Sequence, residues 1–146
     1  MAAAPLAVAA TALPEEGGRT VVVRDRSGEE LLTAELPRNG GFALAYRHSY
    51  YDAAARERFS TEEDGEIRLR AIESPRAAVL DYYALPGDRT RSGSWLRLVP
   101  RAQRGYEQLP LIATEVGRRS LLVGGKRYPL YGREARHLTI TVEDGA

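Results

Sequence analysis

The chain has 146 residues, enough for one domain with a buried core, and 43% of them are hydrophobic. Its 21 basic and 20 acidic residues leave a formal net charge of +1, so the chain as a whole lacks the basic character of a nucleic-acid-binding or anionic-membrane-binding protein. The absence of cysteine excludes disulfides, thiolate nucleophiles and cysteine-ligated metal sites.

The N-terminal segment, residues 1–18, is small and apolar up to Leu13 and then breaks at Pro14-Glu15-Glu16. Its Ala-x-Ala pattern is typical of the cleavage region of a secretory signal, although it lacks a basic start and is too short to span a bilayer. We interpret residues 1–18 either as the remnant of a signal or membrane anchor or as a flexible Ala-rich tail. In both interpretations the folded domain comprises residues 19–146.

From residue 19 onward, short runs of strand-forming residues are separated by turn residues at intervals of about 8 to 12 residues. A first hairpin is predicted from Thr20–Asp25 and Glu30–Leu36, and a type I′ turn at Gly124-Gly125, because both central residues of that turn need positive φ. Further strands are predicted at Phe42–Ser49, Ala55–Thr61, Glu66–Glu73, Ser94–Val99, Leu109–Glu115, Ser120–Val123, Arg127–Tyr131 and His137–Glu143. The fold class is therefore all-β, a single antiparallel barrel or sandwich of about ten short strands with at most one short helix.

The segment Pro75–Leu85 fits two structures. Ser74 and Pro75 suit the N-cap and the first residue of a short helix, whereas the β-branched and aromatic residues that follow favour a strand. The residues favour a strand slightly over the short helix, and both structures stay open. A polar loop is predicted over residues 87–94. Residues 100–110 are expected to form a longer connection with room for a helical turn.

The hairpin that contains His48 carries polar residues on an apolar face. Alternation places His48 on the same face of Phe42–Ser49 as the apolar side chains of that strand. On the returning strand, Glu57 shares a face with Phe59. Pairing Tyr46 with Phe59 would set His48 directly opposite Glu57, at a Cβ separation of about 4.5–5.5 Å that allows a hydrogen bond.

The next hairpin fits the same face. A three-residue loop, Glu63-Asp64-Gly65 with Gly65 left-handed, sets Phe59 opposite Leu69 and Thr61 opposite Ile67. A two-residue Asp-Gly turn would instead mismatch the two faces.

The polar pair has two interpretations. In the first, His48 and Glu57 are a satisfied structural pair that fixes the register of the hairpin. In the second, they line a binding pocket with tyrosine walls, and the ligand-binding residues are Tyr46, Arg47, His48, Tyr50, Tyr51 and Glu57. No cofactor and no metal site is predicted, because two histidines without cysteine would need carboxylates from distant strands.

A small hydrolase or isomerase that uses His48 as general base and Glu57 as its orienter is the alternative function. Ser49 is a poor candidate nucleophile, because it lies on the opposite strand face from His48 and the chain has no G-x-S-x-G elbow. His137 alternates with threonines and is expected to face solvent. The remaining aromatic residues form either a pocket or the core and rim of the β-fold: Tyr82, Tyr83, Trp95, Tyr106, Tyr128 and Tyr131.

The stretch "YRHSYYDAAARERF" resembles the signature of a bacterial family known as domain of unknown function 1850. That signature has an aromatic residue, any residue and His-Ser, then a hydrophobic residue, a short turn and Glu-x-aromatic. Tyr46, His48, Ser49, Glu57 and Phe59 match it. The later stretch "VGRRSLLVGGKRYPLYGREARHLTITVED" is similar to the family's C-terminal strands, so the likeness covers residues 40–143.

Two departures accompany the resemblance. The turn lacks the proline expected near Ala54, and the glycine-rich stretch expected after Ser74 is replaced by Pro75-Arg76-Ala77-Ala78. The resemblance implies a small extracytoplasmic or membrane-anchored β domain. The family's genes are often found beside tripartite ATP-independent periplasmic transporters of the TAXI type, which implies an accessory or solute-handling role.

Together, the residues and the resemblance lead us to expect a non-enzymatic binding or transporter-accessory module in the periplasm or cell envelope. The expected partner is a small-molecule solute or a transporter component, and not a nucleic acid. Contact with a membrane is expected only through an N-terminal anchor.

Overall fold

The computed structural model describes residues 18–145, and β-strands dominate that part of the chain. The signal remnant or tail predicted for residues 1–18 falls almost wholly on residues 1–17, outside the described residues. The described elements are β1 (Arg19–Asp25), β2 (Glu30–Glu35), β3 (Phe42–His48), β4 (Ala53–Thr61), β5 (Ile67–Ser74), α1 (Ala77–Tyr82), β6 (Gly87–Ser92), β7 (Trp95–Pro100), β8 (Gly105–Tyr106), β9 (Leu109–Ala113), β10 (Ser120–Val123), β11 (Lys126–Pro129) and β12 (Arg136–Asp144).

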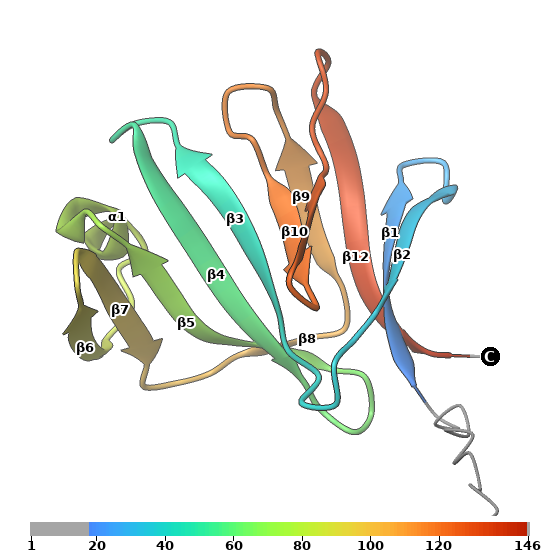
Figure 1. The fold of residues 1–146 in the computed structure, drawn as a ribbon, viewed down its shortest axis with the longest axis horizontal. Coiled ribbons are helices and arrows are strands. Elements are labelled where there is room, and N and C mark those ends of the chain that lie inside the picture. Colours follow the sequence, from blue (N-terminus) through green and yellow to red (C-terminus); the bar gives the residue numbers. More distant parts are fainter. Residues whose placement is uncertain (1–17, 146) are drawn as a thin grey trace, which may run out of the picture.

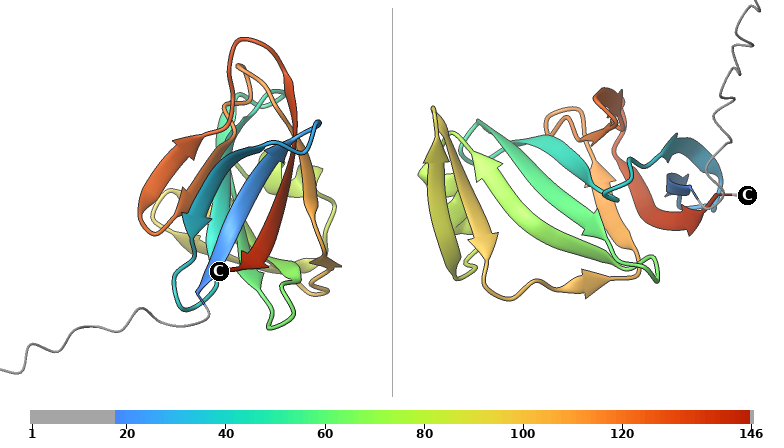
Figure 2. Two further views of the ribbon diagram at one scale, coloured as in Figure 1. Left: turned by 90° about the vertical axis from the view of Figure 1, so that its right-hand side faces the viewer. Right: turned by 60° about the horizontal axis from the view of Figure 1, so that its bottom comes forward.

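The strands form two antiparallel sheets, which confirms the predicted all-β class. The small sheet has the order β2-β1-β12-β9, and Figure 2 shows β2, β1 and β12 side by side in its left-hand view. The large sheet has the order β11-β10-β3-β4-β5-β7-β6, with β8 paired to β5 (Figure 1). Because these pairings form two separate sheets, the arrangement corresponds to a sandwich and not to a closed barrel.

The main hydrophobic core lies between the two sheets. The small sheet contributes Val21, Val23 and Ile140, each fully buried, and the large sheet contributes Phe42 and Phe59. The two phenylalanine rings stack with centroids 5.2 Å apart. Each such side chain stabilises the fold by about 1.5–3 kcal/mol when it leaves water, so this core holds the two sheets together.

The slight preference for a strand at Pro75–Leu85 is wrong, because the segment contains the short helix α1. Val79 and Leu80 of α1 are fully buried, and Leu80 packs against Ile72 of β5 and Leu98 of β7. Tyr82 and Tyr83, which favoured a strand, lie at the end of α1, and Tyr82 is 66% exposed. Burial of two neighbouring apolar side chains on the large sheet therefore outweighs local β propensity.

Two further segments differ from the prediction. Residues 87–94, predicted as a polar loop, contain β6, which pairs with β7 around a tight turn at Gly93-Ser94. Nearly all of β6 is exposed at the sheet edge, so its sequence has no apolar alternation to signal a strand. Residues 100–110 contain the two-residue strand β8 where room for a helical turn was expected.

Three predicted features are confirmed. The first hairpin joins β1 and β2. The β4–β5 hairpin sets Phe59 opposite Leu69 and Thr61 opposite Ile67, and Gly65 has a φ of 89°. The β10–β11 turn has positive φ at both Gly124-Gly125 positions, 58° and 77°.

The inner face of β4, which points toward the main core, is covered at its two ends by different elements. Ala53 and Ala55 pack beneath Val79 of α1, whereas Phe59 packs in the core between the sheets. Glu57 shares this face and lies between the two covers. The fold thus leaves one gap on the inner face, and Glu57 occupies it.

Candidate functional site

The predicted pairing of His48 with Glu57 is wrong. In the β3–β4 hairpin, His48 lies opposite Ala53, and Glu57 lies opposite Leu44. Tyr46 faces Ala55 where Phe59 was predicted, so the register differs by four residues from the prediction. Both polar residues remain on the inner face, because an even shift preserves the alternation of side chains.

The shift follows from the length of the turn. The strands close around four residues, 49–52, and Asp52 adopts a left-handed conformation with a φ of 48°. The Arg47 guanidinium donates from Nε to Oδ1 of Asp52 at 2.5 Å and from a terminal nitrogen to the Asp52 carbonyl at 2.9 Å. These two hydrogen bonds stabilise a turn that is shorter than the predicted register requires.

His48 is enclosed by aromatic rings. Its side chain lies 5.2 Å from the ring of Tyr51 and 4.7 Å from that of Tyr82, measured between centroids, and the second contact is edge-on. The Tyr51 backbone N–H donates to Nδ1 of His48 at 3.4 Å. This bond requires Nδ1 to be an acceptor, so it fits the neutral tautomer that carries its proton on Nε2.

Glu57 pairs with an arginine from a distant part of the chain. Nη1 of Arg119, in the connection before β10, lies 3.5 Å from Oε1 of Glu57, and the two side chains are 28% and 17% exposed. The guanidinium also lies over the ring of Tyr46, 4.7 Å from its centroid. Burial raises the pKa of the Glu57 carboxyl, and the charge of Arg119 opposes that rise.

Two tyrosine hydroxyls complete the polar cluster. The hydroxyl groups of Tyr46 and Tyr83 form a short hydrogen bond beside Glu57. Burial raises the pKa of both phenols, and the nearby Glu57 carboxylate raises the pKa of Tyr83 further. Both hydroxyls therefore keep their protons at neutral pH and remain hydrogen-bond donors.

A cleft of about 570 Å³ opens above this cluster. We call it the tyrosine cleft. Tyr82 at the end of α1 and Tyr83 directly after it form one wall, and Val116 and Arg119 of the β9–β10 connection form the other. Five of the six predicted site residues line it: Tyr46, Arg47, His48, Tyr50 and Glu57. The sixth, Tyr51, packs against the His48 ring and stands outside the lining.

A second cleft, of about 810 Å³, continues from the first. We call it the β9 cleft, because the four residues Leu109–Ile112 of that strand line it. The two clefts share Glu57, Ile112 and Arg119. His137 lies at the β9 cleft and is exposed, as predicted.

Arg119 was missed as a site residue. Tyr82 and Tyr83 were named only within the wider set of aromatic residues that form either a pocket or the core and rim, so their signal was their aromatic character. Arg119 carried none, because it is one of twenty arginines and lies 62 residues from Glu57 in the sequence.

No protein-family model matches the chain, and neither the curated proteins nor the solved structures include a significantly similar one. Within residues 18–145, no helix is both long and apolar enough to cross a bilayer. The same residues contain no group of three or more acidic or histidine side chains arranged to hold a metal ion.

Proposed function

We propose that this protein is a non-enzymatic binding module that takes a small organic ligand in the tyrosine cleft. The observation that carries the proposal is the Glu57–Arg119 pair, which lines an open cleft and does not belong to the packed core. A part-buried ion pair stabilises a fold little, since desolvation offsets most of its attraction. Its position in a concave site of ligand size is typical of a recognition group.

The cleft suggests the chemistry of the ligand. Arg119 has several N–H donors, and within residues 18–145 its side chain donates a single hydrogen bond, to Glu57 at 3.5 Å. Exposed Tyr50 and Tyr82 add flat apolar surface at the cleft. A small molecule with an acceptor oxygen for Arg119 and a ring or flat apolar part for the tyrosines would match both features.

The enzymatic alternative has less support. The alternative hypothesis has His48 as general base and Glu57 as the residue that orients the imidazole. Glu57 instead pairs with Arg119, and Nδ1 of His48 accepts from the Tyr51 backbone. The imidazole therefore lacks the carboxylate partner on which the hydrolase or isomerase hypothesis depended.

The partner rests on the sequence resemblance, and the location rests on that resemblance and on the signal-like pattern of residues 1–18. On that basis we propose that the module acts in the periplasm or cell envelope and serves a solute transporter. Cell fractionation of the natural host and the identity of the neighbouring genes test this part. Recovery in the cytoplasmic fraction, away from any transporter gene, would contradict it and leave the cleft proposal untouched.

The binding proposal is tested by ligand-observed NMR with a fragment library of carboxylates, sugars and aromatic alcohols. Wild-type protein should give a set of ligands that Arg119→Met and His48→Ala lose, because both side chains line the cleft. Arg133→Gln is the matched control: it removes one exposed arginine away from either cleft and should keep every ligand.

A melting curve is recorded for each variant, so that a loss of binding is counted only where the fold is retained. If the variants lower the melting temperature but bind the same fragments as the wild type, the binding proposal is wrong. The same conclusion follows if the wild-type protein selects no fragments at all.

A further inference from the structure

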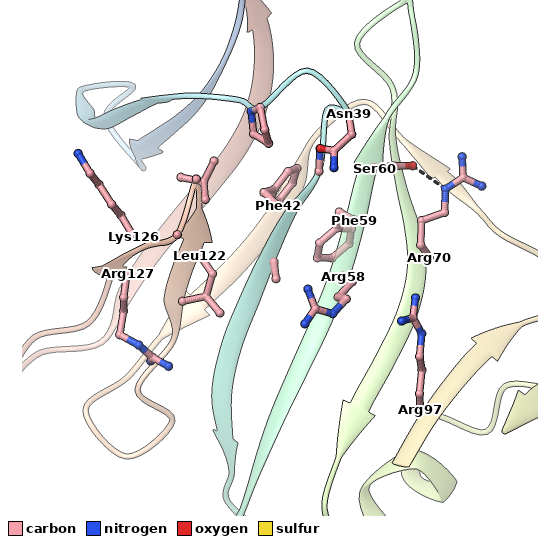
Figure 3. A pocket seen from close by; sticks show the side chains of 16 residues that line it. Asn39, Phe42, Arg58, Phe59, Ser60, Arg70, Arg97, Leu122, Lys126 and Arg127 are labelled. Atoms are coloured by element: carbon pink, nitrogen blue, oxygen red, sulfur yellow. Dashed lines mark hydrogen bonds between the residues drawn. The ribbon is translucent and has the colours of Figure 1, made fainter. Parts of the chain in front are cut away.

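The opposite face of the large sheet carries a second concave site. Arg58 alternates with Glu57 and Phe59 along β4, so its side chain points away from the core and from the tyrosine cleft. A trough of about 690 Å³ lies on this outer face, within the size range of small-molecule sites. Figure 3 shows the side chains that line it, from the β10–β11 hairpin on one side to β5 and β7 on the other.

We call this site the basic trough, because all the charged residues that line it are basic. Five basic residues and no acidic residue line it: Arg58, Arg70, Arg97, Lys126 and Arg127. The chain as a whole has a formal net charge of only +1, so positive charge is concentrated on this face. A cleft lined by one sign of charge focuses the field and attracts counter-ions of the other sign.

Internal ion pairs do not neutralise the trough. The carboxylate of Glu73 is shared by three guanidinium groups. Its oxygens lie 2.5 Å from Arg58, 3.8 Å from Arg56 and 4.0 Å from Arg97. Glu62 is likewise shared, between Arg68 and Arg70. Among residues 18–145, no carboxylate lies within 4.0 Å of the basic groups of Lys126 and Arg127.

The strand register shows how the charges are spaced. One row of paired residues crosses the outer face in the order Arg127, Leu122, Ala43, Arg58 and Ala71. The two arginines stand on β11 and β4, three strand spacings or about 14 Å apart at the backbone. Between them the floor is apolar, because it consists of one leucine and one alanine. Figure 3 shows Lys126 and Arg127 on one side of the trough and Arg58, Arg70 and Arg97 on the other.

We propose that the basic trough binds a small organic anion that carries one oxyanion group at each end of an apolar segment. Guanidinium groups match the geometry of carboxylate and phosphate oxygens, so each end meets arginine. The apolar segment lies over Leu122 and Ala43. This site is separate from the tyrosine cleft and does not depend on the function proposed for that cleft.

NMR titration with α,ω-dicarboxylates tests the proposal. Suberate should bind about tenfold more tightly than octanoate, which has the same length and one carboxylate, and than succinate, which is too short to reach both ends. A matched alkyl bisphosphate shows whether phosphate is preferred to carboxylate. Amide shifts of Ala43 and Leu122 should report the binding.

Two double variants separate a site from a general charge effect. Lys126→Gln/Arg127→Gln should weaken suberate about tenfold, since these exposed side chains have no ion-pair partner to lose. Arg101→Gln/Arg104→Gln removes the same charge from an exposed connection and should change the affinity less than about twofold. Glu57→Gln, in the other site, should also leave suberate binding unchanged.

Three results would overturn the proposal. Suberate binding no more tightly than octanoate would remove the need for two anionic ends. Equal weakening by both double variants would show that only net charge matters. Binding of a long polyanion such as heparin, with none of the small anions bound, would assign the trough to a polymer.

Discussion

The carboxylate of Glu57 lies 3.5 Å from the guanidinium of Arg119. Glu57 stands on β4 between the part of the large sheet that α1 covers and the part that the small sheet covers. Two residues further along β4, Phe59 is buried in the main core, and two residues before, Ala55 is buried beneath α1. The same strand face is thus apolar at both ends and charged in the gap. Because the gap is open, this charge pair can meet a ligand.

If the pair serves binding and not stability, replacing both partners with apolar residues should be tolerated by the fold. Glu57→Leu alone should lower the free energy of unfolding by about 1–3 kcal/mol, because it leaves the Arg119 guanidinium part-buried without a carboxylate. Adding Arg119→Met should recover most of that loss while ligand binding stays abolished. Urea unfolding of the two variants measures this. A double variant no more stable than Glu57→Leu would show that the pair supports the fold.

The protonation of Glu57 should couple stability to pH. Burial raises the pKa of Glu57 above its ordinary value of 4.5 in spite of Arg119, so the folded state holds this proton more tightly than the unfolded state. Its stabilising contribution is therefore complete below about pH 4.5 and is lost as the pH rises through the folded-state pKa. The free energy of unfolding of the wild type, relative to Glu57→Gln, should fall across that interval.

Asp52 provides a control of opposite sign. The hydrogen bond and charge of Arg47 lower the pKa of this exposed carboxyl, so its contribution is present above its unfolded pKa and is lost as the pH falls. The stability difference between wild type and Asp52→Asn should therefore rise with pH in the acidic range. If the Glu57→Gln difference also rose with pH, the assigned direction for Glu57 would be wrong.

Alternation in the sequence predicted which face each residue of the His48 hairpin occupies, but it does not determine the register. A shift of four residues leaves every side chain on its predicted face, so the pattern fits both pairings equally well. The turn at Asp52 contains neither glycine nor an Asn-Gly pair, so the sequence does not indicate the position of this turn. Where glycine does mark the turn, at Gly65 and at Gly124-Gly125, the prediction is confirmed.

The site is less predictable than the fold, because its parts come from separate segments. Tyr46 and Glu57 lie in one hairpin and are visible in a single stretch of sequence. Tyr83 directly follows the helix α1, which forms because Val79 and Leu80 become buried against the large sheet. Arg119 reaches the cleft only through the β9–β10 connection, and only the folded chain brings it to Glu57.

The helix α1 should depend on its two buried residues. Leu80 is fully buried between Ile72 and Leu98, so Leu80→Ala should lower the free energy of unfolding by about 2–4 kcal/mol. Hydrogen exchange should quicken in α1 before it does in β1 and β12, because the main core is untouched. Leu85→Ala, at a 36% exposed position after the helix, should cost less than about 1 kcal/mol. Equal losses for the two variants would contradict this role of Leu80.

The β10–β11 turn should be sensitive to substitution for conformational reasons alone. Gly125 has a φ of 77°, and a Cβ added to it would meet no atom within 4 Å, so the only cost of Gly125→Ala is the left-handed backbone. We expect a loss of about 1 kcal/mol in the free energy of unfolding, and a smaller loss for Gly125→Asn, because asparagine tolerates this conformation. Gly132→Ala is the control: its φ lies outside the left-handed range and its Cβ would make ordinary contacts at 3.7 Å, so it should be nearly neutral. Thermal or urea unfolding of the three variants measures these losses. Equal losses in the free energy of unfolding for Gly125→Ala and Gly132→Ala would mean that the turn is not type I′ in solution.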